Sequence, residues 1–195
     1  MNFLAHIHLS GKNEPIIIGN FIGDFVKGKE IDNYDERIRN GIVLHREIDH
    51  FTDNHEVVLE SKKRLRPRYR HYAPVIIDVY YDHFLATHWS KYSSEDLKRF
   101  TEHFYALTAN YKDQIPDRAR YILRYMKRDN WLYNYQFLDG IRRALTGMSQ
   151  RTKYDSKMEH AVEELRENYE SFEQEFFEFF PALQSHCDAF IKSLP

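Results

Sequence analysis

Apolar side chains recur at every third or fourth position through most of the chain, and polar side chains fill the positions between them. That spacing gathers the apolar residues on one face of a helix. No series of Val, Ile and Thr alternates with polar residues, and 7 glycines and 6 prolines leave few turns. We therefore predict an all-α fold, with helices over about residues 15–27, 34–54, 55–66, 72–89, 94–111, 116–128, 131–146 and 155–180.

The last of these helices has the clearest amphipathic pattern. Acidic residues cover its polar faces, and Pro181 is expected to end or kink it because proline lacks the amide hydrogen of a helical bond. Since the predicted helices differ widely in length and no linker or repeat separates them, we expect one irregular multi-helix domain over residues 1–195. The apolar stripe of the last helix consists of Met158, Val162, Leu165, Tyr169, Phe172, Phe176 and Phe180.

The composition excludes several classes of protein. A chain of 195 residues that is 42% hydrophobic can bury a sizeable core, and its net charge of −2 argues against a general binder of polyanions. The single cysteine, Cys187, cannot form an intrachain disulfide, which is typical of a reducing compartment. No signal peptide is visible, and no apolar run approaches the roughly 20 residues of a membrane-spanning helix. We expect a soluble cytoplasmic protein without a membrane partner.

Three short stretches combine acids and histidines within predicted helices. They run from Gly19 to Asp24, from His45 to Asp49 with Asp53 one turn further on, and over residues 78–83. Residues four apart share one face of a helix, so each of the last two stretches presents a same-face pair. These pairs are His45 with Asp49 and Asp78 with Asp82.

The apolar surroundings of these acids indicate a bound cation. Asp78 and Asp82 lie in a stretch that is apolar nearly all round, where two uncompensated carboxylates would be strongly unfavourable. Carboxylates and neutral imidazoles suit Mn²⁺, Mg²⁺, Fe and Zn²⁺. We therefore predict a divalent metal site with Asp24, His45, Asp49 and Asp82 as its ligands.

Two further residues have alternative roles near this site. His6 and His8 point in different directions on a helix, so only one of them can reach the cluster; we favour His6, as a catalytic group or as a residue that orients a ligand. Arg46 lies one turn from His50 and next to His45. Its guanidinium can hold a phosphate in two hydrogen bonds or pair with an acid.

Residues 62–71 form a basic run in an otherwise near-neutral chain. This run predicts either a docking surface for an acidic protein or an ordinary solvated helix face. A nucleic-acid partner is disfavoured, because aromatic residues do not alternate regularly with these cations. The predicted partner-binding residues are Lys62, Lys63, Arg64, Arg66, Arg68 and Arg70.

These motifs resemble the bacterial acyl carrier protein phosphodiesterases, also called holo-acyl carrier protein hydrolases, which are divergent members of the HD-type metal-dependent phosphohydrolase superfamily. The resemblance is densest over the first ninety residues and continues at lower specificity as Trp131-Leu, Tyr135 and Gly147-Met148 with Arg151. The motifs of the first part are Asn2-Phe-Leu-Ala-His-Ile-His-Leu9, Gly19-Asn20, Asp24-Phe-Val, Gly41-Ile, His45-Arg, Ile48-Asp, Thr52-Asp-Asn54, Asp78, Asp82-His-Phe-Leu and His88-Trp.

The resemblance implies a fold like that of the HD-type phosphohydrolases and an Mn²⁺-type cofactor, with Mg²⁺, Fe or another divalent ion as alternatives. It also implies holo-acyl carrier protein as substrate, cleaved at the phosphodiester between 4′-phosphopantetheine and a serine. The chain departs from the superfamily in lacking its adjacent His-Asp pair. The nearest forms are His45 with Asp49 and the reversed pair Asp82-His83.

In the expected mechanism, Asp78 orients or deprotonates the attacking water, and His83 or His6 protonates the departing serine oxygen. Arg46 binds the non-bridging oxygens, and the basic run docks the acidic carrier protein. Two alternatives stay open. The same site could hydrolyse a nucleotide or cyclic nucleotide, or the chain could be a non-catalytic module that binds a carrier protein or RNA.

Overall fold

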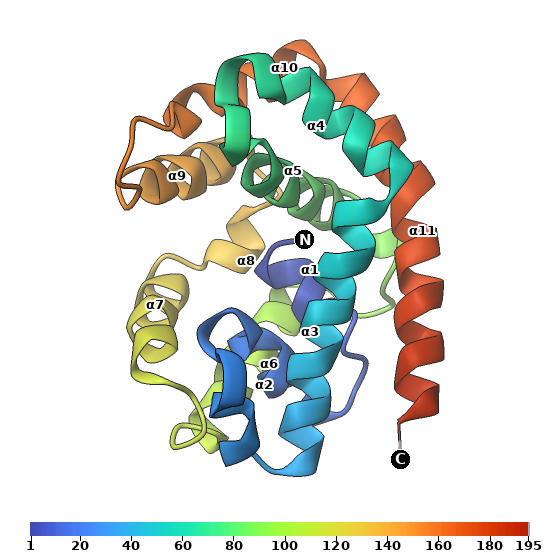
Figure 1. Ribbon diagram of the computed structural model, residues 1–195, viewed down its shortest axis with the longest axis vertical. Helices are drawn as coiled ribbons and strands as arrows, with labels where there is room; N and C mark the ends of the chain where they lie inside the picture. The colour runs from blue at the N-terminus through green and yellow to red at the C-terminus, as the bar shows by residue number, and fades with distance from the viewer. Residues whose placement is uncertain (195) are drawn as a thin grey trace.

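The computed structural model describes residues 1–194, which form eleven α-helices joined by short 3₁₀ turns and loops, with no strand in that range (Figure 1). This architecture confirms the predicted all-α class. The α-helices are α1 (Phe3–His8), α2 (Glu14–Ile22), α3 (Glu36–Asn54), α4 (Glu56–Tyr69), α5 (Ala73–Thr87), α6 (Leu97–Asn110), α7 (Asp117–Arg128), α8 (Trp131–Asn134), α9 (Leu138–Ser149), α10 (Ala161–Glu167) and α11 (Tyr169–Ser193). The 3₁₀ turns are η1 (Gly23–Phe25), η2 (Gly28–Asn33), η3 (Arg70–Tyr72), η4 (Trp89–Lys91) and η5 (Met158–His160).

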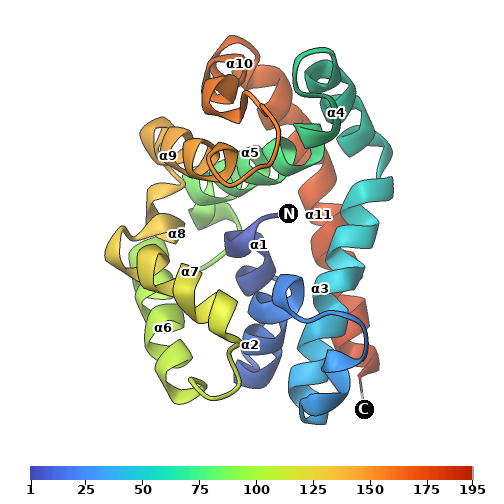
Figure 2. The ribbon, with the colours of Figure 1, turned by 60° about the vertical axis from the view of Figure 1, so that its left-hand side comes forward.

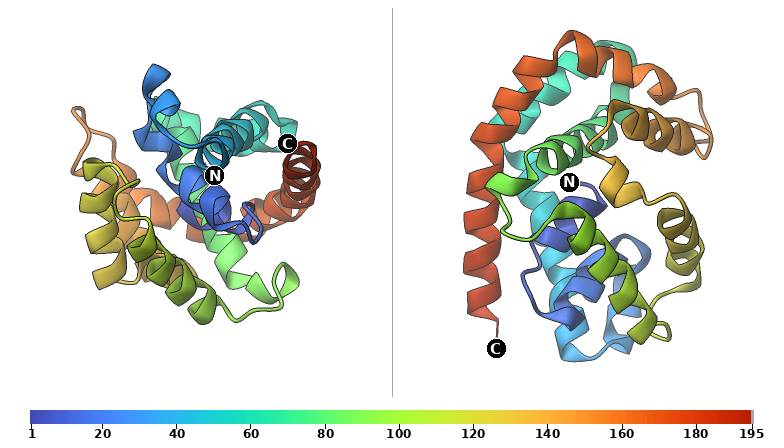
Figure 3. Two further views of the ribbon diagram at one scale, coloured as in Figure 1. Left: turned by 90° about the horizontal axis from the view of Figure 1, so that it is seen from below. Right: turned by 180° about the vertical axis from the view of Figure 1, so that it is seen from behind.

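The longest helix, α11, lies along one side of the molecule beside α3 and α4 (Figures 1 and 3). Its buried rings contact the helices next to it: Phe179 packs against Phe51 of α3, and Phe176 packs against Tyr81 of α5. Helices α7, α8 and α9 lie on the other side, and α1 lies between the two sides (Figure 2). The N-terminal segment therefore lies near the centre of the helical assembly.

Helices α2 and α3 pack closely because each has a glycine at the contact. A Cβ atom on Gly19 would lie 2.1 Å from the carbonyl oxygen of Ile38, and one on Gly41 would lie 2.3 Å from that of Ile16. Both distances are far shorter than a van der Waals contact. Any side chain larger than hydrogen would push the two helices apart.

Helix α1 is held on α5 by Asp82. This carboxylate is fully buried, and it accepts hydrogen bonds from the backbone N–H groups of Asn2, Leu4 and Ala5 at 3.3, 2.7 and 3.2 Å. No side chain of the α1 segment caps these amides. Asp82 thus satisfies the free N–H groups at the start of α1, as an N-cap residue would, but from another helix.

The structure corrects several predicted helix boundaries. Helix α1 was not predicted, and the helix expected over 15–27 ends at Ile22, so that Asp24 lies in the turn η1. The helix expected over 131–146 is divided into α8 and α9, and the one expected over 155–180 is divided into α10 and α11 at Asn168. These breaks come from packing in the tertiary structure, which overrides a continuous helical pattern.

Pro181 lies within α11 and does not end it, since the helix continues to Ser193. Proline removes one helical hydrogen bond, but buried side chains on both sides of it keep the helix in place. These are Phe176, Phe179, Phe180, Leu183 and Cys187. Within residues 1–194 no helix has the length and apolar character needed to cross a membrane.

We predict that Gly41→Ala lowers the free energy of unfolding by about 1–3 kcal/mol, because its Cβ would press α2 away from α3. Gly147→Ala in α9 is the matched control. A Cβ there meets nothing within 4 Å, so this change should stabilise the protein by about 0.4–1 kcal/mol. Urea denaturation of both variants measures the difference, and equal effects would contradict the close α2–α3 contact.

Candidate metal centre

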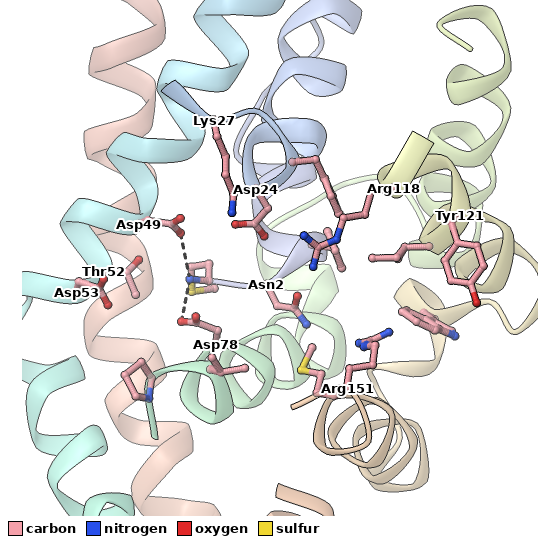
Figure 4. A pocket seen from close by; sticks show the side chains of 18 residues that line it. Asn2, Asp24, Lys27, Asp49, Thr52, Asp53, Asp78, Arg118, Tyr121 and Arg151 are labelled. Carbon is pink, nitrogen blue, oxygen red and sulfur yellow. Dashed lines mark hydrogen bonds and ion pairs between the residues drawn. The ribbon is translucent and has the colours of Figure 1, made fainter. Parts of the chain in front are cut away.

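A cavity of about 700 Å³ opens between α3 and α5 on one side and α7, α8 and α9 on the other (Figure 4). The carboxylates of Asp24, Asp49 and Asp78 line one end, and Arg118 and Arg151 point into the cavity from the opposite side (Figure 4). Apolar side chains form another part of the wall. They are those of Phe3, Phe25, Val75, Ile122, Trp131 and Met148.

Two histidines meet behind the carboxylates. His6 of α1 and His45 of α3 are 3% and 4% exposed, and their rings stack with centroids 4.0 Å apart. Each directs its Nε2 at one oxygen of Asp49, at 3.2 Å in both cases, and Nε2 of His45 lies 3.3 Å from Oδ1 of Asp24. One ligand atom from each of His6, His45 and Asp49 lies within 4.8 Å of the others, which is the spacing that a single divalent ion needs.

Asn20 of α2 orients both imidazoles. Its side-chain oxygen accepts a hydrogen bond from Nδ1 of His6 at 2.8 Å, and its backbone oxygen accepts one from Nδ1 of His45 at 2.8 Å. The amide nitrogen of Asn20 donates to the backbone oxygen of His6 and to Ser10, which fixes the side-chain orientation. Histidines that bind metals are commonly held in this way by a hydrogen bond from the other ring nitrogen.

The two imidazoles differ in charge. Burial and the charge of His45 lower the pKa of His6, so His6 is neutral. Burial also opposes charge on His45, but hydrogen bonds to Asp24 and Asp49 outweigh it and raise its pKa to about 9. Despite its own burial, which acts in the opposite direction, Asp49 is held well below its ordinary pKa by the hydrogen bond from His45.

The donor set fits a cation. Neutral His6 carries its one ring proton on Nδ1, which donates a hydrogen bond to Asn20. The lone pair of its Nε2 therefore faces Asp49 and the backbone oxygen of Met1, which lies 3.1 Å away. These groups are all acceptors, so a positive ion among them would relieve their repulsion. A cation already bridges the neighbouring acids: the α-amino group of Met1 lies 2.9 Å from Asp78 and 3.9 Å from Asp49 (Figure 4).

Of the predicted metal ligands, the structure brings together Asp24, His45 and Asp49, and it adds His6 to them. Asp78 lines the same cavity. Asp82 does not join them, because both its oxygens are taken up by the amides of α1. Burial raises the pKa of Asp82 to about 7.

Two of the predicted catalytic residues, Arg46 and His83, belong neither to the cavity lining nor to the histidine cluster. His83 is 2% exposed, and its ring nitrogens face the backbone oxygen of Tyr135 and the hydroxyl of Tyr169. Arg46 is exposed and reaches the backbone oxygen of Val26 at 3.5 Å. Neither residue contacts the histidine cluster in this structure.

The predicted basic run is largely neutralised within the chain. The ammonium of Lys62 is 2.7 Å from a carboxylate oxygen of Asp53. The side chain of Lys62 is 3% exposed, so Lys62 offers no surface to a partner. Arg64 forms two hydrogen bonds with Glu175, Arg68 pairs with Glu164, and Lys63 pairs with Glu60. Arg66 and Arg70 are exposed.

Sequence reasoning missed Asn20 and the cations Lys27, Arg118 and Arg151 as functional candidates. Asn20 and Arg151 lie in motifs that carry the family resemblance, which was the available signal. Lys27 lies three residues after Asp24, and Arg118 lies in the first turn of α7, far from the other motifs in sequence. Only the folded chain brings these cations to one cavity.

The fold and the cluster together define a helical protein with a histidine–carboxylate site suited to a divalent cation. The chain belongs to the acyl carrier protein phosphodiesterase family, whose model matches residues 1–183. It is 35% identical over 184 residues to an acyl carrier protein phosphodiesterase of Enterobacter sp. (strain 638), covering 94% of this chain and 95% of that relative. It is 34% identical to one of Klebsiella pneumoniae (strain 342) with the same coverage. The relative from Salmonella newport (strain SL254) is 33% identical over 188 residues, 96% of this chain and 97% of that one. No solved structure matches the chain.

The raised pKa of His45 predicts how the stability of the metal-free protein changes with pH. Because the folded-state pKa is about 9 and the unfolded value is 6.5, the stabilisation is fully present below pH 6.5 and is lost as the pH rises through 9. With EDTA present, wild type should exceed His45→Gln in unfolding free energy by roughly 1–3 kcal/mol more at pH 6 than at pH 10. Denaturant titrations at both pH values measure this, and a constant difference between the two proteins would contradict it.

Proposed function

We propose that this protein is a metal-dependent phosphodiesterase that hydrolyses the bond between 4′-phosphopantetheine and the serine of holo-acyl carrier protein, releasing the apo-protein and 4′-phosphopantetheine. The observation that carries the proposal is the convergence of His6, His45 and Asp49 on one point at the end of the cavity. The family supports the substrate class, because the relatives are named acyl carrier protein phosphodiesterases.

His6, His45, Asp49 and Asp24 would hold the cation, for which Mn²⁺ is our first candidate and Mg²⁺ or Fe are alternatives. When bound, such an ion lowers the pKa of a coordinated water and offsets charge on a phosphoryl oxygen. Asn20 would keep both Nε2 atoms directed at it. We also propose that this family is related to the HD-type phosphohydrolases.

Asp78 would take the role of orienting or deprotonating the attacking water. It lies beside Asp49 at the same end of the cavity, and it is only partly buried, so water can reach it (Figure 4). The non-bridging phosphate oxygens would be bound by Arg118 and Arg151, because their guanidinium groups line the cavity. These two residues take the role that was predicted for Arg46 from the sequence. His6 would serve as a ligand and not as the proton donor.

The shape of the cavity supports a substrate with a long, mostly apolar arm. About 700 Å³ lies within the range of small-ligand sites, and apolar side chains form part of the cavity wall. The pantetheine arm combines a phosphate with an extended uncharged chain. The bound ion and the two arginines would contact the phosphate, and the apolar side chains of the wall would contact the uncharged chain.

We expect activity on holo-acyl carrier protein to require a divalent cation. EDTA should abolish the loss of the phosphopantetheine mass seen by mass spectrometry, and added Mn²⁺ should restore it. His45→Ala and Asp49→Ala should lower kcat/KM by about a hundredfold or more, because each removes a ligand.

Asp82→Asn is the control for these variants. It should lower the melting temperature, because an amide cannot accept all three N–H groups of α1, yet leave the amount of bound metal unchanged. Full turnover in a verified metal-free sample would refute the metal mechanism. Hydrolysis of cyclic nucleotides with no effect on the carrier protein would favour the alternative substrate class.

Asn20→Leu should weaken binding of Mn²⁺ by roughly tenfold to a hundredfold, because Leu has a similar size but accepts no hydrogen bond from His6. Isothermal titration with Mn²⁺ measures the affinity without reference to turnover. Asn20→Asp retains the acceptor and should lose less affinity than Asn20→Leu. Unchanged Mn²⁺ affinity in both variants would show that Asn20 does not position the ligands.

A further inference from the structure

Helix α7 carries the highest local density of positive charge outside the basic run. Its inner face buries Ala119, Leu123 and Met126. Between residues 117 and 128 the helix has one acid, Asp117, which pairs with Arg120. Its cations are Arg118, Arg120, Arg124, Lys127 and Arg128.

The exposed side of α7 is ordered by contacts among its own side chains. Arg124 lies over the ring of Tyr121 at 5.3 Å, and Arg128 lies over the ring of Tyr125 at 5.0 Å. The two tyrosines are themselves in contact, with centroids 5.1 Å apart and a hydrogen bond between their hydroxyls at 3.1 Å. Side chains held in this way lose less conformational freedom when a partner binds.

Several of these cations have no acidic partner among residues 1–194. Arg118, Arg124 and Lys127 form no ion pair there, and neither does Arg151 at the rim of the cavity. On α7, two of the five cations are paired, Arg120 with Asp117 and Arg128 with Asp129. In the basic run on α4, four of the six cations pair with acids of the same chain. Unpaired cations attract an acidic protein more strongly than cations that are already neutralised.

Helix α7 also borders the candidate site. Arg118, Tyr121 and Ile122 form part of the cavity wall, across from the carboxylates on α3 and α5 (Figure 4). Tyr121 is 53% exposed, and among the described residues Tyr154, at 64%, is the one large hydrophobic side chain that is more exposed. An aromatic residue surrounded by arginines at the mouth of a cavity is typical of a protein-binding surface.

We propose that the exposed face of α7, formed by Arg118, Tyr121, Arg124 and Lys127, docks an acidic surface of the carrier protein. In this arrangement the arm attached to the carrier enters the cavity past Arg118 and Tyr121. The inference rests on the proposed function and replaces α4 with α7 as the docking element. Carrier proteins as a class are small and acidic, which matches the charge of this face.

The test compares two charge-reversal variants with the same change in net charge: Arg124→Glu/Lys127→Glu on α7 and Lys63→Glu/Arg66→Glu on α4. All four positions are exposed, and none contacts the metal cluster. The affinity of each purified protein for holo-carrier protein is measured by fluorescence anisotropy at low and high salt, and kcat and KM are measured with Mn²⁺. Turnover of bis-p-nitrophenyl phosphate reports on the site itself.

The α7 variant should bind the carrier protein about tenfold more weakly at low salt, with a smaller difference at high salt, while kcat and turnover of the small substrate stay near wild type. The α4 variant should bind like wild type. Equal losses in both variants, or a loss in the α4 variant alone, would overturn the assignment to α7 while leaving the proposed function intact. If wild-type protein neither binds nor cleaves the carrier, the proposed function fails, and this inference fails with it.

Discussion

The close contact between α2 and α3 is the constraint on which the candidate site depends. Because Gly19 and Gly41 lack side chains, the two helices approach until Asn20 lies beside His45. From that position Asn20 accepts a hydrogen bond from Nδ1 of each imidazole, one with its backbone oxygen and one with its side-chain oxygen. Two histidines from different helices thus share a single anchor, and their free nitrogens face the same carboxylate.

Burial of polar groups has two different consequences here. The buried carboxylate of Asp82 is satisfied by backbone N–H groups, so its position serves to attach α1 to α5. The acceptors around His6 and Asp49 have too few hydrogens among them, so they retain a capacity for a cation. The difference between a structural acid such as Asp82 and a candidate ligand such as Asp49 therefore lies in which groups surround each carboxylate, since both lie in helices beside apolar neighbours.

The same distinction applies to the positive charges at the surface. On α4, acids from α10 and α11 neutralise Arg68 and Arg64 and turn them into links between helices. On α7, Arg124 rests on the ring of Tyr121, which orients its guanidinium without cancelling its charge, whereas Arg128 is paired with Asp129. A cation on an aromatic ring stays available to an acidic partner in a way that an ion-paired cation does not.

The sequence by itself determined the helical class, most helix positions, and the grouping of His45 with Asp49, because these follow from periodicity within one helix. It also indicated that His6 and not His8 reaches the site; on α1 the ring of His8 instead contacts Trp89. Only the tertiary structure decided that Asp82 caps α1, that Asn20 orients both histidines, and that Arg118 reaches the cavity. Each of these depends on atoms from helices that are distant in sequence, and a local pattern contains no information on which helix will supply the partner.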